Sequence, residues 1–419
     1  MFTSFSTALS ALSATSTAID VVGNNLANMN TDGFKTSTVA FHDLVTQSLG
    51  AGLGETQVGF GVGAPVTLRE FSQGATQTTN GPLDAAISGD GFFIVTDPNG
   101  AIEYTRGGNF KVDQSGDLET ATGEKLQGWM AGSDGAVVSN GPIGNITVPT
   151  GTVKPPRQST QFSFDINLDA TGTAGPPPTT FSTSINIYDS LGAAHVLTLT
   201  FTKTANPGEW NYDISVPDAD LTAPFTPVTG TVQFDPNGQL SSPAATDTPP
   251  QIEITGFADG AADMTGPTAL SWELFSGSAG RLTQFSQPSE TSALAQDGSA
   301  AAQLTHVGIA NGGFIVATYS DGEQQKVGQL ALATVRNPDS LIAVGNNNFQ
   351  VSARSALPAV GVPGTGGRGQ VLGGAVESST VDMATEFTNL IVFQRAYQAN
   401  AKVVTTVDQL SQDTINLKQ

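Results

Sequence analysis

The sequence predicts a multidomain α+β protein with helices at both ends of the chain and two mostly antiparallel β domains between them. Residues 1–29 contain no proline and a single charge, and residues 380–418 contain neither proline nor glycine, which is typical of helices. All 23 prolines lie between these segments, among short apolar stretches that indicate strands joined by turns. A chain of 419 residues is long enough for two or three domains.

The N-terminal segment has the spacing of an amphipathic helix. Large apolar side chains recur in alternating steps of three and four, with Ser16 and Gly23 as weak positions, and this pattern predicts a coiled-coil-like seam. The helix should end in the Asn- and Gly-rich cluster at 24–33, because both residue types adopt the left-handed conformation that closes helices. The residues expected to pack in this seam are Phe2, Phe5, Leu9, Leu12, Ile19 and Leu26.

The C-terminal segment carries two offset apolar stripes. Ser379, with Asp382 three residues later, resembles a capping box at the start of a helix. Because one partner helix covers only one stripe, two stripes indicate more than one packing partner. The first stripe comprises Met383, Phe387, Leu390, Gln394, Tyr397, Ala401 and Val404, and the second comprises Val403, Val407, Leu410, Thr414 and Leu417.

These terminal helices need partners. Burial along one seam is too little to offset the backbone entropy lost when about thirty residues become ordered. The C-terminal helix can cover part of the apolar surface, and other copies of the chain can cover the rest. A heterologous contact of that kind builds a filament. The alternative, on periodicity alone, is a helical hairpin that caps the β body within one chain.

The clearest sheet is expected at 181–216, where three segments of alternating apolar and polar residues predict an antiparallel meander. Two strand–turn hairpins are expected at 87–100 and 312–322. Prolines flank the meander, which indicates an inserted domain. We predict four parts: a helical polymerisation domain at 1–30 with 375–419, an extended connector at 31–72 with a Gly-rich stretch at 50–65, a β-rich middle domain at 73–150 with 285–374, and an inserted outer β domain at 151–284.

Charge and composition exclude several classes of function. The net charge of −21 argues against binding to nucleic acid or to an anionic membrane surface. The absence of cysteine excludes disulfides and thiolate chemistry. No apolar run approaches the roughly 20 residues that span a bilayer. The first basic residue is Lys35, so no ordinary cleavable signal is expected.

Signals for catalysis, metals or cofactors are weak, and none of these is expected. The histidines, His42, His195 and His306, lie far apart and form no metal-binding motif. His195 is expected to be a partly exposed strand residue.

Three further patterns have ordinary explanations. The Gly-x-Gly-x-x-Gly pattern at 364–369 is followed by more glycine instead of a helix, so a linker is favoured over a dinucleotide site. The acidic segments at 113–117 and 235–238 lack the spacing of a calcium loop and are typical of turns. Asp165 and Asp169 are interpreted as surface charges.

The segment from Gly23 to Lys35 resembles the N-terminal signature of the bacterial flagellar rod and hook proteins, and two C-terminal segments, 377–382 and 394–400, resemble the motifs at the other end of that family. The motif residues are Asn24, Asn25, Leu26, Ala27, Asn28, Thr31, Gly33, Phe34 and Lys35, with Gln394, Arg395, Tyr397, Gln398 and Asn400. Further matches lie at 87–95, 104–106, 126–129, 185–189, 296–298 and 345–349, and the last three are similar to the hook branch of the family.

The resemblance implies a structural subunit of the flagellar hook, which polymerises outside the cell into a flexible hollow tube and transmits motor torque from rod to filament. It implies that the terminal helices line the tube and that the β domains form outer layers. The implied partners are further copies of the chain, the distal rod protein, the hook cap protein, a hook–filament junction protein and the flagellar type III export apparatus, without nucleic acid, membrane or cofactor.

Two alternatives remain at this point. One is a distal rod protein that carries an insertion. The other, from a different class, is a secreted β-rich adhesin or carbohydrate-binding protein, which would need only the domain at 151–284. An enzyme is the least supported, because no set of nucleophile, acid and base is apparent.

Overall fold

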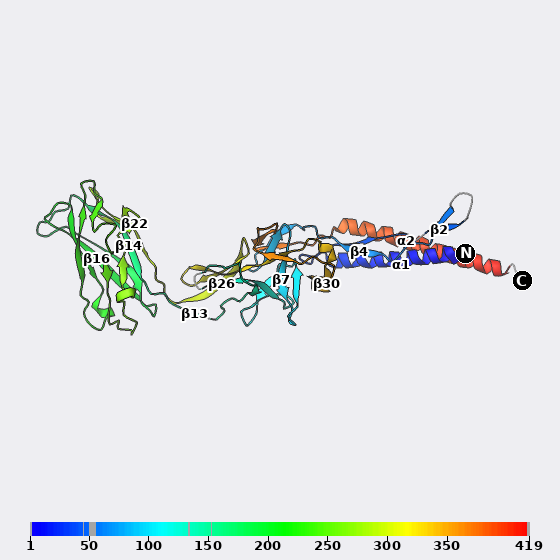
Figure 1. Cartoon of the computed structure of the whole chain (residues 1–419), viewed down its shortest axis with the longest axis horizontal. Coiled ribbons are helices and arrows are strands. Elements are labelled where there is room, and N and C mark those ends of the chain that lie inside the picture. The colour runs from blue at the N-terminus through cyan, green and yellow to red at the C-terminus, as the bar shows by residue number, and fades with distance from the viewer. Residues whose placement is uncertain (1, 45, 50–55, 133–134, 152, 417–419) are drawn as a thin grey trace. The chain divides into compact units, whose positions relative to one another are not determined.

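The computed structural model describes all residues except 1, 45, 50–55, 133–134, 152 and 417–419. The chain is mostly β with one helix at each end, which confirms the outline of the predicted fold class (Figure 1). It forms two compact units. Unit 1 comprises residues 1–150, 305–318 and 323–419, and unit 2 comprises residues 151–304 and 319–322.

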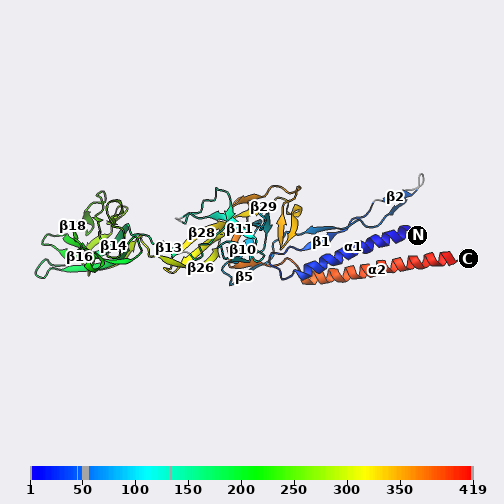
Figure 2. The ribbon, with the colours of Figure 1, turned by 90° about the horizontal axis from the view of Figure 1, so that it is seen from below.

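Unit 1 contains an antiparallel helix pair, α1 (Phe2–Ala27) and α2 (Met383–Asn416), with both chain ends at the same end of the pair (Figures 1 and 2). α1 ends inside the predicted Asn-rich cluster. At the start of α2, the carboxylate Oδ1 of Asp382 accepts the N–H of Thr385 at 2.7 Å and caps the helix. The predicted cap at Ser379 is therefore wrong, because Ser379 lies before the helix and its hydroxyl accepts the N–H of Val381 at 3.3 Å.

The segment predicted as an extended connector is a two-stranded ribbon. β1 (Ser37–Ala40) pairs with β4 (Val66–Arg69), and β2 (Thr46–Leu49) pairs with β3 (Thr56–Gly59), both antiparallel. The ribbon contacts the helices, since the N–H of Val62 donates to the hydroxyl of Ser10 at 3.2 Å. The Gly-rich stretch at 50–55 lies outside the described residues.

The centre of unit 1 is a large antiparallel sheet in the order β27–β28–β11–β7–β8–β31–β30. The pairs β7–β8 and β27–β28 are the two predicted hairpins, which the structure confirms. Phe92, Trp129 and Phe349 are buried in its core. The strands are β5 (Thr76–Thr78), β6 (Ala85–Ser88), β7 (Phe92–Thr96), β8 (Ile102–Thr105), β9 (Phe110–Val112), β10 (Leu118–Thr120), β11 (Lys125–Met130), β12 (Gly144–Asn145), β27 (Phe314–Tyr319), β28 (Gln324–Leu330), β29 (Leu332–Thr334), β30 (Ile342–Gly345), β31 (Asn348–Gln350), β32 (Ala359–Gly361), β33 (Gln370–Gly373) and β34 (Ala375–Glu377).

Unit 2 contains two five-stranded sheets. One is the predicted meander, β15–β16–β17–β18–β19, whose strands are all antiparallel. The strands of unit 2 are β13 (Val153–Lys154), β14 (Gln161–Asp169), β15 (Thr180–Tyr188), β16 (Ala194–Lys203), β17 (Glu209–Ser215), β18 (Val228–Phe234), β19 (Leu240–Ser242), β20 (Gln251–Ile252), β21 (Leu270–Trp272), β22 (Phe275–Ser276), β23 (Ala279–Gly280), β24 (Leu282–Phe285) and β25 (Glu290–Gln296). The next strand, β26 (Ala302–Ala310), begins in unit 2 and continues into unit 1.

The second sheet of unit 2 is mixed, whereas the sequence predicts mostly antiparallel β domains. β14 runs parallel to β21 and β24 and antiparallel to β25. Because β25 pairs with β14, this unit continues past residue 284. Alternate side chains of both sheets form one apolar core, in which Leu199, Trp210 and Trp272 are fully buried.

Candidate assembly surface

α1 presents a buried face of small residues and an exposed face of large ones. Buried residues such as Ala8, Ala18 and Val22 recur at helical spacing, and their small side chains let α2 and the ribbon approach closely. Phe5 and Leu9, which belong to the predicted seam, are 39% and 54% exposed. The contact inside one chain therefore centres on the small residues and covers the predicted seam only in part.

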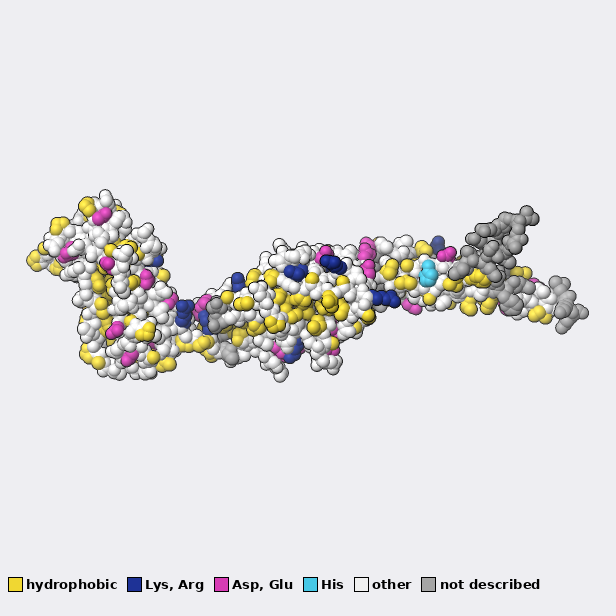
Figure 3. Space-filling view, viewed as in Figure 1, with side chains coloured by type: hydrophobic (Ala, Val, Ile, Leu, Met, Phe, Trp, Pro, Cys, Tyr) yellow, Lys and Arg dark blue, Asp and Glu magenta, His cyan; other side chains and the backbone are white. Residues whose placement is uncertain are grey.

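α2 is less covered than α1, and Glu386 is the one buried side chain among its described residues. Its half-buried side contacts α1 and the ribbon, where the rings of Phe393 and Phe41 lie 6.0 Å apart. Figure 3 shows hydrophobic side chains at the surface along the helix pair. The exposed large apolar side chains of α2 are Met383, Phe387, Ile391, Val392, Tyr397, Val403, Leu410 and Ile415.

The predicted stripes are thus only partly covered within one chain. The half-buried members are Leu12, Ile19, Leu26, Leu390, Val404 and Val407. The exposed members are Phe5, Leu9, Met383, Phe387, Tyr397, Val403 and Leu410, while Leu417 and the side chain of Phe2 lie outside the described residues. Sequence reasoning missed the face that α1 turns inward, although alanines at positions 8, 11, 14 and 18 mark it. We call the exposed members, with Ile391, Val392 and Ile415, the helix stripes.

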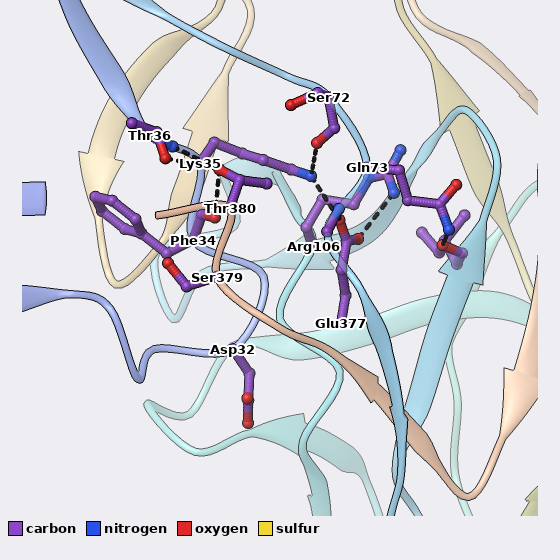
Figure 4. Close-up of polar contacts among 12 residues, drawn as sticks. Asp32, Phe34, Lys35, Thr36, Ser72, Gln73, Arg106, Glu377, Ser379 and Thr380 are labelled. Atoms are coloured by element: carbon purple, nitrogen blue, oxygen red, sulfur yellow. Dashed lines mark hydrogen bonds and ion pairs between the residues drawn. The ribbon is translucent and has the colours of Figure 1, made fainter. Parts of the chain in front are cut away.

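A buried ionic cluster joins the segment that follows α1 to the segment that precedes α2, and Figure 4 shows its side chains. Nζ of Lys35 lies 2.6 Å from Oε1 of Glu377, and a guanidinium nitrogen of Arg106 lies 2.9 Å from Oε2. Nζ of Lys35 also donates to the carbonyl of Ser72 at 2.5 Å. The side chains of these three charged residues are at most 4% exposed, so the single carboxylate offsets two buried cations. We call Lys35, Arg106 and Glu377 the Glu377 cluster.

The Glu377 cluster joins segments from both ends of the chain to the β body. Burial lowers the pKa of Lys35, and the hydrogen bond to Glu377 opposes this effect. The N–H of Gly33 donates to the Glu377 carbonyl at 2.6 Å, and the N–H of Gly74 donates to its carboxylate at 2.7 Å. The sequence motifs contain these residues, but nothing in their spacing identified them as charge partners.

Gly33 is required at its position for two reasons. Its φ of +69° lies in the left-handed region, and a Cβ there would lie 2.5 Å from the backbone of Arg106. The motif residues before it close α1, because the Nδ2 group of Asn28 donates to Oδ1 of Asn24 at 2.7 Å. The N-terminal motif therefore has a structural role within one chain.

Asn25 connects α1 to both the ribbon and α2. Its Nδ2 group donates to the carbonyl of Ser37 at 2.8 Å and to Oε1 of Glu386 at 3.0 Å, and its Oδ1 accepts the N–H of Ser37 at 3.0 Å. Burial raises the pKa of Glu386, the hydrogen bond from Asn25 lowers it, and the charge of Asp382 raises it further. The net shift is upward.

The C-terminal motif at 394–400 has no such role inside the chain. Gln394, Arg395, Tyr397 and Gln398 are exposed, and Asn400 is half-buried. In the described part of the chain, none of these five side chains forms a hydrogen bond or an ion pair. These polar groups lie on the same helix as the exposed apolar residues of α2.

The turn and linker interpretations of the weak motifs are confirmed. Oδ1 of Asp113 accepts the N–H groups of Ser115 and Asp117, both at 2.8 Å, which is a turn geometry. Asp235 forms the same kind of turn. The glycine pattern at 364–369 is a loop between β32 and β33, and no helix opens from it.

His195 is a strand residue in β16, as the sequence predicts, but the predicted partial exposure is wrong. The side chain is 7% exposed, because the Phe257 ring packs against it with 4.7 Å between ring centroids.

By length and composition alone, one helical segment of the described chain, Ser4–Ala27, could cross a membrane. The core helix of a soluble protein passes the same test, so this finding is weak evidence for a membrane span.

Family comparisons match most of the chain to flagellar axial proteins. The profile "Flagella basal body rod protein" matches residues 5–35, and "Flagellar basal body rod FlgEFG protein C-terminal" matches 372–417. "Flagellar hook protein FlgE/F/G D1 domain" matches 86–173, and "Flagellar basal body protein FlaE D2 domain" matches 168–299. These matches define the class as flagellar rod and hook proteins.

Comparisons with single proteins narrow the class. The chain is 35% identical to the flagellar hook protein FlgE of Salmonella typhimurium, over 99% of this chain and 100% of that protein. It is 34% identical to that of Borreliella burgdorferi, over the full length of both chains. The crystal structure of Helicobacter pylori flagellar hook protein FlgE2 shares the fold, with a TM-score of 0.51 and 13% identity over 71% of this chain and 99% of that one.

The chain belongs to the flagellar hook protein family. Its role is that of a structural subunit of the hook, and the family is not one of enzymes. The match to full-length hook proteins includes residues 151–304. The region that the distal-rod alternative treats as an insertion is therefore part of the hook proteins themselves.

Proposed function

We propose that the chain polymerises through its helix stripes into the flexible hollow tube of the hook, which transmits motor torque from the rod to the filament. The observation that carries this proposal is the large apolar surface that α1 and α2 leave exposed, with Leu9, Ile391 and Leu410 each more than half exposed. Exposed apolar surface of this extent is typical of protein–protein interfaces.

Helices of neighbouring copies would pack against these stripes. Such packing has the geometry of a coiled-coil-like core, in which each large side chain fills a gap on the facing helix. Close packing resists slippage, and that resistance suits a tube that carries torque. The exposed polar groups of Gln394, Arg395 and Gln398 would supply hydrogen bonds between copies, which gives the C-terminal motif a role that it lacks within one chain.

The four predicted parts have distinct roles in this proposal. Residues 1–30 with 375–419 form the polymerisation domain, residues 31–72 connect it, and the two β domains form outer layers. The predicted boundary between these β domains at 284 lies at 304 in the structure. The tube lies outside the cell, attached to the basal body. The partners, by resemblance to the family, are the distal rod protein, the hook cap protein, a hook–filament junction protein and the flagellar type III export apparatus.

The test uses two surface substitutions that retain helix propensity. Leu9→Gln with Phe387→Gln removes one exposed apolar side chain from each helix, and glutamine is a good helix former. We expect a strain with this variant to secrete folded subunits but to build no hooks in electron micrographs. The matched control, Ser13→Gln with Thr388→Gln, changes exposed polar residues on the same helices and should build normal hooks. Normal hooks from the first variant would contradict the proposal.

A further inference from the structure

A buried histidine in unit 2 lies among three carboxylates. His195 is the second residue of β16, and Asp189 lies in the turn that connects β15 to this strand. Nε2 of His195 lies 3.1 Å from Oδ2 of Asp189, and Nδ1 lies 3.3 Å from Oδ2 of Asp220. Asp259 brings a third carboxylate close to Asp189, with a candidate ligand oxygen of each within 4.8 Å of the other. We call these four residues the His195 cluster.

The protein alone does not satisfy the His195 cluster. The Nδ1 atom of His195 is buried and has no hydrogen-bond partner, although the Asp220 carboxylate faces it. A neutral imidazole has one N–H group, so one of its two nitrogens always presents a lone pair to a carboxylate. Two carboxylates, of Asp189 and Asp259, also approach each other. Like charges near each other repel, and a bound cation or a shared proton relieves that repulsion.

The surrounding backbone fixes the positions of these groups. Oδ1 of Asp189 accepts the N–H groups of Leu191 and Ala193, at 2.8 and 2.9 Å, which leaves Oδ2 to face the cluster. Oδ1 of Asp259 likewise accepts the N–H of Ala261 at 3.0 Å. The cluster is therefore built by ordered turns, and one carboxylate oxygen of each of these acids is directed elsewhere.

We propose that Asp189, His195 and Asp259 bind a divalent transition-metal ion through Oδ2, Nε2 and one carboxylate oxygen. One candidate ligand atom from each of the three residues lies within 4.8 Å of the other two. Ligand atoms of one zinc ion lie about 3–4 Å apart, since each bond to the metal is about 2.0–2.2 Å long. The side chain of Asp259 is exposed, so it is the one that can move from within 4.8 Å to this shorter distance.

Asp220 completes the arrangement as a positioning residue. When a metal occupies Nε2, the proton lies on Nδ1 and points at the Asp220 carboxylate, which satisfies the atom that has no partner in the free protein. A carboxylate on the far nitrogen of a metal-bound histidine is a common support for such sites. Imidazole with carboxylates favours Zn²⁺, whereas Ca²⁺ and Mg²⁺ prefer oxygen ligands alone.

Calorimetric titration of the full-length chain with ZnCl₂ tests the proposal, on protein purified without a polyhistidine tag and treated with chelator. We expect one Zn²⁺ per chain. Asp259→Asn should weaken binding by at least about tenfold, and Asp220→Asn by about 10–100-fold. The control Asp263→Asn removes the same charge from the same loop, outside the His195 cluster, and should change affinity less than about twofold.

A spectroscopic measurement keeps the test independent of folding. The chain has only three histidines, so the ¹⁵N resonances of His195 can be assigned with His42→Gln and His306→Gln. We expect Zn²⁺ to shift the Nε2 resonance of His195. No Zn²⁺ binding, equal weakening in Asp259→Asn and Asp263→Asn, displacement by Ca²⁺, or an imidazolium spectrum unchanged by Zn²⁺ would each overturn the proposal. The last result would mean that a proton is the cation.

Discussion

Unit 2 buries its large apolar side chains, whereas the helix pair of unit 1 leaves many of its own exposed. In unit 2, Leu199, Trp210 and Trp272 are fully buried between two facing sheets. In the helix pair, Leu9 is 54% exposed and Leu410 is 53% exposed. The core of unit 2 is therefore closed within one chain, whereas part of the apolar surface of the helices stays exposed to solvent.

The difference follows from which residues each element turns inward. The strands of the meander alternate, so every second side chain enters the core of unit 2. α1 turns mainly alanines toward its neighbours, and its large side chains Phe5 and Leu9 stay exposed. In our proposal, burial in unit 2 stabilises the single subunit, and the helix stripes stabilise contacts between subunits.

The largest change in stability is expected at the Glu377 cluster, whose contacts are all buried within one chain. Glu377→Gln leaves Lys35 and Arg106 buried without a carboxylate, and we expect a loss of about 3–5 kcal/mol in unfolding free energy. Chemical denaturation followed by the fluorescence of Trp129, the tryptophan of unit 1, measures this loss. Glu119→Gln breaks a more exposed pair with Lys111 and should cost less than about 1 kcal/mol.

A pair of leucine substitutions tests the comparison itself. Leu199→Ala should destabilise unit 2 by about 2–5 kcal/mol, because it leaves a cavity in a closed core. Leu9→Ala should change monomer stability by less than about 0.5 kcal/mol, because the side chain is exposed and alanine favours helices. Only the second should impair hook assembly with the monomer intact. Equal destabilisation by both changes would remove the distinction between the two regions.

The smallest effect is expected at Glu386. Its pKa is raised above the unfolded value of 4.5, so the folded chain binds the proton more tightly. The stability that the neutral form contributes is present below pH 4.5, and it is lost as pH rises from there through the folded pKa. Glu386→Gln should therefore stabilise the helix pair slightly at neutral pH and flatten this pH dependence.

Circular dichroism melts at several pH values measure that effect. Asp408→Asn is the control, because it removes the same charge from an exposed site on α2. An unchanged pH dependence in Glu386→Gln would mean that another group is responsible.

The sequence was most informative where a local rule decides the structure. Period-two alternation predicted the meander, and turn residues predicted both hairpins, since each depends on neighbouring residues alone. The inner face of α1 was not predicted, because large residues dominate a periodicity count and alanines do not. Spacing also assigned Ser379 as a cap, although Asp382 is the residue that lies next to the first turn of α2.

Long-range charge contacts were beyond sequence reasoning. Lys35 and Glu377 are separated by 342 residues, and no local pattern pairs them. His195 appeared to be an ordinary strand residue, because its burial depends on Phe257 and its charge environment depends on Asp220 and Asp259. Both sites arise from tertiary contacts that bring distant segments together.

Hydrogen exchange of the backbone amides in residues 2–27 and 383–416 tests the central claim most directly, with monomer and assembled hook compared side by side. We predict fast exchange in the monomer and protection that rises by about 100-fold or more on assembly, because neighbouring copies cover the helix stripes only there. In both samples, the amides of β15–β17 should be equally protected. Equal protection of the helices in monomer and hook would contradict the account, because the helix pair would then be complete in one chain.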